Sequence, residues 1–586
     1  MIKIIGRVFK IYLHISKLNL ILLLLFSLTL SILPIFSLGL TEKIGNAISG
    51  HTELHQLILL LILQSTIYIC DCLITLFNNI IKNNLDYKYT YYFEKKLIEK
   101  VSRIKTSALD SSRIYNSIMQ VSHIIPLIGT RFLLDIIEFS KGVISIIGIV
   151  YILKNLHWSI ITLLIIISTI NFFMSRLFNK EELNILNQTS ETKRKKDIIW
   201  DLLKKREFAI QTRILQVSHY LIQKWSKYFW KASIPEQKLN NKREYLVQTL
   251  MITTHILQLC VLVIFVIKEW PNIPIGTFMM LLQAISLFQG YSHQIVGSLS
   301  NLHQTLIYLP LYFNILEEEE DTFKNAYNFT GLEKKIMVKD LKFKYSNSDS
   351  YSLYNVNFEI LKGEKVAVVG FNGSGKTTLI KCLIGLYDNY EGNIYYDDKE
   401  VLDYNQNSLR NNIGWLAQDF VKFPFSLIEN IFVGDVRKQE KHVEVPLKKS
   451  LIYDSVQSLP LGLKTMLDPA FEQGVDLSGG QWQKVALARL FFRDSNLLFM
   501  DEPTSAIDPI SENKIYKNLL KQEINKTIII LTHRLNVCNL VDKVIVMKDG
   551  GVAAIGTHKE LIKSSAYYRE LYQSQSEDGY ITKQKT

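Results

Sequence analysis

The sequence predicts a polytopic α-helical membrane domain of six spans, fused to an α/β domain that carries a P-loop. Two observations predict this architecture. Apolar runs long enough to cross a bilayer crowd the first half of the 586-residue chain. In the second half, an apolar run at 365–370 leads into a loop of the pattern G-x-x-x-x-G-K-T, which is typical of a strand, a phosphate-binding loop and a helix. We place the membrane domain at 1–316, a linker at 317–331 and the second domain at 332–586.

Six apolar runs account for the membrane domain, since a helix needs about 20 apolar residues to span a bilayer. The first is longer than the core of a signal peptide and has no small-residue cleavage site, so we expect it to be retained. The last is interrupted by glutamines, and its helical pattern continues to about Leu316. The predicted spans are Leu18–Leu40, Leu57–Phe77, Ile136–Leu153, Trp158–Met174, Leu246–Ile267 and Ile275–Gln289.

Basic residues gather in two of the segments between the spans. The segments 78–131 and 175–244 carry 9 and 16 Lys or Arg, whereas the other connections carry few. Cytoplasmic segments of membrane proteins are enriched in these residues. We therefore predict a multi-pass protein of the plasma membrane whose termini and two long segments are cytoplasmic. Much of the net charge of +12 is then a topology signal, and we predict no nucleic-acid partner.

The two long cytoplasmic segments are predicted to be helical extensions of the spans. Each is expected to present a short element to the second domain, at Ser107–Gln120 and at Lys204–Val217. The alternative is a solvated amphipathic helix that contacts only lipid headgroups, which the basic patterning of the two long segments also fits.

Ionisable residues also fall within the spans. Asp71 lies inside the second span, and Asp135, Glu138 and Lys141 share one face of the third. Charges in hydrocarbon are costly, so they usually face a water-filled cavity. The trio fits either a cavity or the cytoplasmic boundary, while Asp71 is deeper and is predicted to face the transport pathway.

The glycine-rich loop after 365–370 predicts a nucleotide phosphate site. Glycines allow backbone N–H groups to wrap phosphate oxygens, and the following helix contributes its positive N-terminus. Lys376 is expected to reach the β- and γ-phosphates of ATP, and Thr377 to ligate Mg²⁺. The predicted nucleotide-binding residues here are Gly370, Asn372, Gly373, Ser374, Gly375, Lys376, Thr377 and Thr378.

A second apolar strand, Leu497–Met500, ends in two acidic residues. Such a strand delivers Asp501 to the Mg²⁺ ion beside the phosphates. Glu502 is then placed to polarise the attacking water as a general base.

The segment Leu477–Gln481 reads LSGGQ and lies just before that strand. It resembles the signature of the ATP-binding-cassette (ABC) superfamily, and the resemblance covers the whole second domain. Ser478, Gly479 and Gly480 suit the N-terminus of an anion-binding helix. The resemblance implies that these residues and Gln481 contact ATP held by the P-loop of a second copy, so that the protein works as a homodimer.

The other residues that are characteristic of the family are also present in this sequence. The resemblance implies that Tyr345 stacks on adenine and that Gln418 senses Mg²⁺ and water. It also implies that Asp508 belongs to the loop that follows the catalytic strand, and that His533 contacts the γ-phosphate. Taken singly, such residues would more often serve packing. One position departs from the family: Phe471–Gly474 reads FEQG where many exporters have GERG.

Several cassette stretches are similar to those of nisin-type lantibiotic exporters, including QDFVKF and the tail AYYRELYQSQ. The resemblance implies an ATP-hydrolysing half-transporter that exports a precursor peptide by alternating access, with cytoplasmic peptide-modification enzymes as candidate partners. About 17 residues precede the first span, so we expect no peptidase domain and a cargo that keeps its leader. A lipid or hydrophobic-drug exporter is the alternative. A regulatory ABC protein that binds ATP without pumping is disfavoured, because Glu502, Gln418 and His533 are all present.

Overall fold

The computed structural model describes residues 2–50, 53–109, 111–153, 188–269, 274–320, 327–345, 348–521 and 525–577, with Thr162, Thr169, Phe173, Glu181, Asn184 and Ile185. The chain divides into two compact units. The first holds residues 1–102 and 116–318, and the second holds residues 103–115 and 319–586. Each unit is described separately below.

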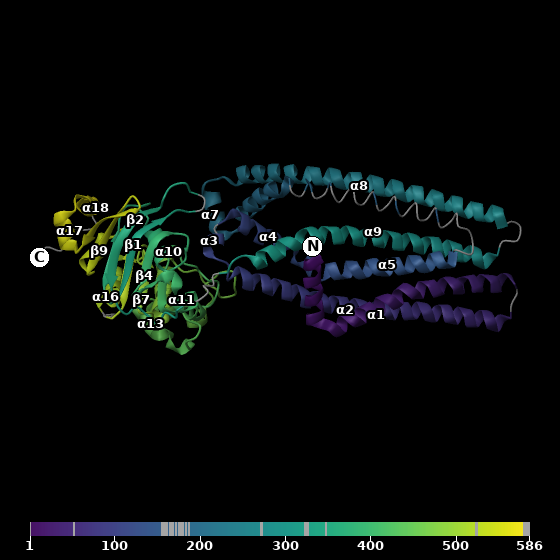
Figure 1. Cartoon of the computed structure of the whole chain (residues 1–586), viewed down its shortest axis with the longest axis horizontal. Helices are drawn as coiled ribbons and strands as arrows, with labels where there is room; N and C mark the ends of the chain where they lie inside the picture. The colour runs from purple at the N-terminus through teal and green to yellow at the C-terminus, as the bar shows by residue number, and fades with distance from the viewer. Residues whose placement is uncertain are drawn as a thin grey trace. The chain divides into compact units, whose positions relative to one another are not determined.

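The first unit is helical throughout its described part (Figure 1). Its helices are long because apolar side chains on most faces suit burial in lipid or in neighbouring helices. Helix α1 has a kink at Ser16, where the backbone leaves helical geometry. The helices are α1 (Ile2–Ser49), α2 (Leu54–Val101), α4 (Ser112–Pro126, which begins in the second unit), a π-helical turn (Leu127–Arg131), α5 (Phe132–Leu153), α7 (Arg206–Ile214), α8 (Ser218–Glu269) and α9 (Ile275–Glu317).

Five predicted spans lie within these helices, in α1, α2, α5, α8 and α9. Among the described residues, three helical stretches are long and apolar enough by themselves to cross a bilayer: Lys3–Ser49, Leu54–Val101 and Gly129–Leu153. The fourth predicted span, Trp158–Met174, lies outside the described residues except for Thr162, Thr169 and Phe173.

Close helix packing shapes the first unit. Helix α1 runs beside α2, and α5 runs beside α9, as Figure 1 shows. Gly45 of α1 faces Gly276 of α9 so closely that a Cβ on either residue would collide with the other helix. Small residues permit such backbone contact within a membrane. Around it lies an apolar cluster from four helices that includes Leu38, Phe265 and Leu281.

Polar side chains form a second set of contacts among α2, α5 and α9. Lys82 Nζ lies 2.6 Å from Glu138 Oε1, and Gln294 Nε2 donates to the other carboxylate oxygen of Glu138. Asn301 Nδ2 donates to Asp135 Oδ1 at 3.1 Å. Two of the three charged residues predicted on one face of the third span therefore have partners inside the bundle.

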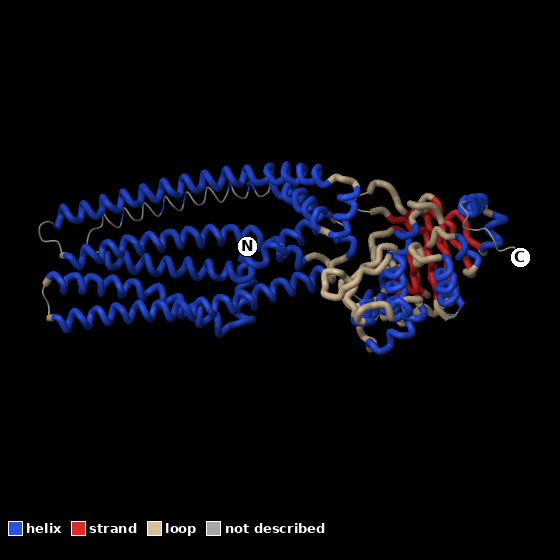
Figure 2. The backbone as a smooth tube through the Cα atoms, turned by 180° about the vertical axis from the view of Figure 1, so that it is seen from behind, coloured by secondary structure: helices blue, strands red, loops and turns tan. Residues whose placement is uncertain are grey.

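The second unit contains two β-sheets and surrounding helices (Figure 2). The smaller sheet is antiparallel, in the order β2-β1-β4-β5. The larger has the order β10-β9-β3-β8-β7-β6 and is parallel except for the β9–β10 hairpin. The strands are β1 (Lys335–Phe343), β2 (Leu353–Leu361), β3 (Lys365–Val369), β4 (Glu391–Tyr396), β5 (Lys399–Glu400), β6 (Ile413–Leu416), β7 (Leu497–Asp501), β8 (Thr527–Leu531), β9 (Lys543–Lys548) and β10 (Gly551–Gly556).

Helices cover both faces of the larger sheet. The α-helices of the second unit are α3 (Thr106–Leu109), α10 (Lys376–Leu383), α11 (Gln406–Asn412), α12 (Leu427–Phe432), α13 (Glu444–Lys449), α14 (Tyr453–Val456), α15 (Gly479–Arg493), α16 (Pro509–Lys521), α17 (His558–Ser564) and α18 (Ala566–Glu577). Short 3-10 helices occur at Val401–Asp403, Glu440–Val443, Gly462–Lys464 and Leu535–Asn539.

The three central strands are completely buried. Every residue of β3, β7 and β8 is buried, as expected for parallel strands with helices on both faces. Ligands of such sheets bind beyond the carboxyl ends of the strands. The loops that follow β3, β7 and β8 meet at that edge, and all three were predicted from the sequence to carry site residues.

The segment 103–115 belongs to the second unit although it connects two helices of the first. Lys105 Nζ lies 2.9 Å from both Glu319 Oε2 and Asp388 Oδ2. A backbone bridge also joins Ile104 to Glu320. Most of the predicted contact element Ser107–Gln120 is therefore in the same unit as the P-loop. The other candidate, Lys204–Val217, lies in the first unit around α7, and its contact with the second domain stays a prediction.

The proposed linker is partly structured. Helix α9 ends at Glu317. Tyr327 N donates to Asp403 O at 2.9 Å, and Phe329, which is buried, donates its N–H to Ser408 Oγ. The boundaries at 316 and 331 remain a proposal.

Candidate functional site

The P-loop joins β3 to α10 through a tight turn that only glycine can make. Gly373 and Gly375 have φ of +80° and +94°, in the left-handed region that side chains disfavour. A Cβ at Gly375 would stand 2.7 Å from Ser352 O, and one at Gly370 would collide with Met547 O. The loop therefore leaves its backbone N–H groups free of covering side chains, at the N-terminus of α10.

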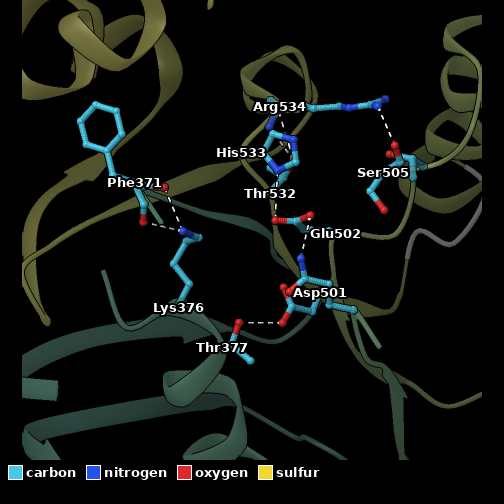
Figure 3. Close-up of polar contacts among 12 residues, drawn as sticks. Phe371, Lys376, Thr377, Asp501, Glu502, Ser505, Thr532, His533 and Arg534 are labelled. Carbon is cyan, nitrogen blue, oxygen red and sulfur yellow. Dashed lines mark hydrogen bonds and ion pairs between the residues drawn. The ribbon is translucent and has the colours of Figure 1, made fainter. Parts of the chain in front are cut away.

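Lys376 is the first residue of α10, and its ammonium lies back over the loop. Its Nζ donates to Gly370 O and Phe371 O, both at 2.9 Å (Figure 3). Burial lowers the pKa of Lys376, while the nearby carboxylates of Glu502 and Asp501 oppose that shift. A buried cation whose hydrogen bonds in the described part of the chain go to carbonyl groups is well placed to receive an anion such as phosphate.

The end of β7 brings Asp501 to the same loop. Thr377 Oγ1 donates to Asp501 Oδ2 at 2.8 Å. Burial raises the pKa of the Asp501 carboxyl, although the Thr377 hydrogen bond lowers it. The Ser374 hydroxyl is buried nearby and has no hydrogen-bond partner in the described part of the chain. The Ser374 hydroxyl therefore lacks, among the described residues, the polar partner that a buried oxygen normally has.

Glu502 stands between two side chains from neighbouring strand ends. Gln418 Nε2, beyond β6, donates to Glu502 Oε2 at 3.2 Å. His533 Nδ1, beyond β8, lies 3.0 Å from Glu502 Oε1, as Figure 3 shows. The Glu502 side chain is 14% exposed. A carboxylate fixed in this way beside a phosphate loop has the geometry of a general base.

A cavity of about 750 Å³ lies over these groups. Its lining contains nine of the predicted site residues: Asn372, Gly373, Gly375, Lys376, Thr377, Thr378, Gln418, Asp501 and Glu502. It also contains Ser350, Tyr351, Ser352, Asp549 and Gly550, which the sequence did not single out. Asp549 and Gly550 form the tight β9–β10 turn, where both have positive φ. An Asp-Gly pair between two apolar strands could have indicated this hairpin.

Tyr345 lies beside the P-loop helix, in a cluster of aromatic rings. Its hydroxyl is 3.0 Å from Thr378 Oγ1, and its ring meets Phe343 and Tyr387 edge-on. The cavity lining in the described part of the chain contains Tyr351 and does not contain Tyr345. The predicted stacking of Tyr345 on adenine therefore stays a prediction, and Tyr351 is a further aromatic side chain at the site.

The LSGGQ segment begins helix α15. Ser478 is the N-cap: its hydroxyl accepts from Gln481 N, and Gln481 Oε1 accepts from Ser478 N at 2.9 Å. This reciprocal capping box fixes the helix start. Gly479 and Gly480 form its first turn. Within the described residues, none of these four lines the P-loop cavity.

Asp508 caps α16, the helix that follows β7 in the chain. Its Oδ1 accepts from Ser511 N at 2.9 Å, at the start of α16. That backbone hydrogen bond lowers the pKa of the exposed Asp508 carboxyl. The structure thus gives Asp508 a capping role, and its predicted contact with ATP stays a prediction.

Comparison with known proteins agrees with this geometry. Residues 353–505 match the family model of the ABC transporter domain. The whole chain has the fold of a bacterial Atm1-family ABC exporter with ATP bound, with a TM-score of 0.82, 20% identity, and coverage of 96% of this chain and 98% of that one. The second unit is an ABC transporter ATPase domain, the chain has the fold of an ABC exporter, and these similarities support ATP-driven export.

Two similar proteins match over nearly their full length. The subtilin transport ATP-binding protein of Bacillus subtilis is 28% identical over 97% of this chain and 94% of its own length. The nisin transport ATP-binding protein of Lactococcus lactis is 26% identical over 97% and 95%. A putative multidrug export ATP-binding/permease protein of Staphylococcus aureus is 35% identical, but over 45% of this chain and 46% of its own length. The predicted family resemblance is confirmed.

Proposed function

We propose that this chain is an ATP-driven exporter and that it moves a lantibiotic-type peptide out of the cell. The observation that carries the proposal is the similarity to the subtilin and nisin transport proteins, which extends through both units of the chain. The higher identity to the multidrug protein covers less than half of the chain, so it bears less on the cargo path. Export of a hydrophobic drug or lipid by the same ATPase remains the second candidate.

The proposed mechanism begins with ATP in the P-loop cavity. Lys376 leaves its two carbonyl partners and binds the β- and γ-phosphates, and the glycine N–H groups surround the phosphate oxygens. Glu502, oriented by Gln418 and His533, accepts a proton from the water that attacks the γ-phosphorus. The bond from that phosphorus to the bridging oxygen breaks, and ADP and phosphate leave. His533 contacts the γ-phosphate as that proton leaves.

We infer that Mg²⁺ accompanies ATP. Thr377 and Asp501 supply hydroxyl and carboxylate oxygens, which Mg²⁺ prefers, and Gln418 supplies an amide oxygen. The raised pKa of the Asp501 carboxyl indicates a buried group that a nearby cation would stabilise in its charged form. When bound, the ion would neutralise charge that develops on the phosphate oxygens.

The working unit is proposed to be a homodimer with two composite ATP sites. The N-terminus of α15 lies outside the cavity of its own chain, so it is available to the nucleotide of a second copy. Closure over two ATPs, followed by hydrolysis and opening, would drive alternating access of the membrane unit. The orientation proposed from the basic segments places both termini in the cytoplasm, on the side where a precursor peptide is made.

The cargo is proposed to leave with its leader attached. Burial raises the pKa of the Cys382 and Cys538 thiols to about 12, so neither is a nucleophile at neutral pH. The other cysteines, Cys70, Cys72 and Cys260, are exposed on membrane-unit helices, within predicted spans. The two buried cysteines of the second unit therefore do not offer the activated thiolate that a leader peptidase of the cysteine type requires.

Mass spectrometry of released peptide tests the cargo. Cells that express the exporter and its precursor peptide, with no separate protease, should release the peptide at the mass of the leader-bearing form. The Glu502→Gln variant is the control and should release none. Cleaved peptide outside the cell would contradict the leader proposal. Equal release from both strains would reject the peptide as cargo, and ATP-dependent efflux of a hydrophobic dye alone would favour the second candidate.

Asp71 provides a test of the transport path. Replacing Asp71 with Asn, within the span part of α2, should reduce peptide export several-fold while ATP hydrolysis changes by less than about twofold, because the neutral isostere removes only a charge that is costly in a membrane. The assay is vesicle uptake beside phosphate release. Glu94→Gln, at an exposed site further along α2, is the matched control and should change neither. Unchanged transport would indicate that Asp71 is only paired within the bundle.

A further inference from the structure

A buried glutamine connects the signature helix to the proposed catalytic base. Gln483 lies on α15, two residues after the LSGGQ segment, and is 4% exposed. Its Nε2 donates to Glu502 O at 2.9 Å and to Ser505 Oγ at 3.1 Å, and its Oε1 accepts from Ala506 N at 2.8 Å. The amide thus uses both of its N–H groups and its oxygen on the segment that begins at Glu502.

Glu502 needs such support because its backbone is unusual. Its φ is +49°, a left-handed conformation that a residue with a side chain adopts only when its surroundings impose it. Three hydrogen bonds hold the residue in place, one of them from Ser505 N to its C=O at 3.3 Å. Its N–H donates to Leu531 O at 2.9 Å, and its C=O accepts from Gln483. The direction of the carboxylate between Gln418 and His533 follows from this fixed backbone.

The loop after Glu502 is held from two sides. On one side, Gly480 at the start of α15 comes so close that a Cβ there would lie 2.7 Å from Ala506 O. On the other side, Arg534, which follows His533, donates through its Nη2 to Ser505 O at 3.1 Å. The loop therefore joins the helix that carries the signature to the strand ends that carry Glu502 and His533.

We propose that Gln483 is a positioning residue for ATP hydrolysis: its amide holds Glu502 in the left-handed conformation that aims the carboxylate, and ties that aim to the position of the signature helix. This inference rests on the proposed function of Glu502 as base. It adds a regulatory consequence. When two copies close, α15 of one copy would move against the nucleotide bound by the other copy. The Gln483 side chain would transmit that movement to Glu502 of its own copy.

A purely structural glutamine would behave differently. Loss of a structural hydrogen bond would lower the melting temperature and would change binding and turnover together. A positioning residue instead lowers kcat and leaves nucleotide affinity intact, because Lys376, Thr377 and the P-loop glycines do not contact Gln483. Measuring kcat and nucleotide affinity separately in a Gln483 variant therefore distinguishes the two roles.

The test is Gln483→Glu in the full-length protein. A carboxylate of the same shape can still accept from Ala506 N but cannot donate to Glu502 O, and it adds negative charge beside that carbonyl. We expect kcat to fall about 10- to 100-fold, as for a base misplaced by a fraction of a bond length. The Kd for a fluorescent ATP analogue should stay within about twofold. Gln457→Glu makes the same change at an exposed site of the second unit and should leave both values unchanged.

A second variant keeps the test decisive if the first does not fold. Gln483→Met fills a similar volume with neither donor nor acceptor and should show the same loss of kcat. Wild-type kcat in either folded variant, or parallel losses of kcat and affinity in both, would overturn the proposal. Glu502→Gln in the same assay separates the two hypotheses: if that variant still turns over ATP, the assignment of the base has failed rather than the role of Gln483.

Discussion

Replacing Glu502 with Gln should leave ATP binding intact and lower the rate of ATP hydrolysis by about 10²–10⁴-fold, the usual contribution of a general base. The amide keeps the shape of the side chain and can still meet Gln418 and His533, but it cannot accept the proton of the attacking water. Phosphate release measures turnover, and a fluorescent ATP analogue measures binding.

The same variant should accumulate as a closed, ATP-bound dimer, because binding drives closure and hydrolysis permits opening. Cross-linking across the proposed contact between the P-loop and the partner's signature segment should be stronger in this variant than in the wild type, while light scattering in detergent should show two chains for both. Glu440→Gln, at an exposed position of the cassette, is the matched control and should hydrolyse ATP normally. Hydrolysis near the wild-type rate in Glu502→Gln would place the base elsewhere, and a persistent monomer would reject the dimer.

Replacing Lys376 with Ala should instead weaken ATP binding. The ammonium lies over the P-loop, 2.9 Å from the carbonyls of Gly370 and Phe371, and is the cation nearest the phosphate position among the residues lining the cavity. A charge-assisted hydrogen bond contributes about 1.5–3 kcal/mol, so the Kd for ATP should rise about 10- to 100-fold.

Lys381→Ala is the control for this change. Lys381 lies on the same helix, but its ammonium is 5.9 Å from the centre of the Tyr387 ring and its side chain is not part of the cavity lining in the described chain. Its loss should change the Kd little. If Lys376→Ala binds ATP like the wild type and fails only in turnover, Lys376 acts in the transition state alone.

Local sequence patterns could predict the phosphate site because the residues that form it are nearly contiguous in the sequence. Strand β3, the glycines and α10 are consecutive, and β7 runs directly into Asp501 and Glu502. A backbone that must wrap phosphates permits few residue types, so the pattern alone is informative. Gln418 and His533 needed the family resemblance, since a lone glutamine or histidine after a strand has no distinctive spacing.

The sequence could not indicate the contacts made across the fold. Gln483 is one polar residue on a helix whose neighbours are mostly buried, and its bonds to Glu502, Ser505 and Ala506 depend on how α15 packs against the end of β7. The pairing of Lys82 with Glu138 likewise joins residues 56 positions apart. Tyr351 and the Asp549–Gly550 turn reach the cavity only because β2 and β9 flank the P-loop.

The chain passes between its two units at three points, after residues 102, 115 and 318. The second unit is therefore connected to the first at three points of the chain rather than by a single linker. The segment 103–115 is covalently continuous with α2 and α4 and is fastened to the cassette by the ion pair of Lys105 with Asp388. Because the chain is covalently continuous at all three points, a displacement of the second unit would act on the ends of α2 and α4 as well as on the end of α9.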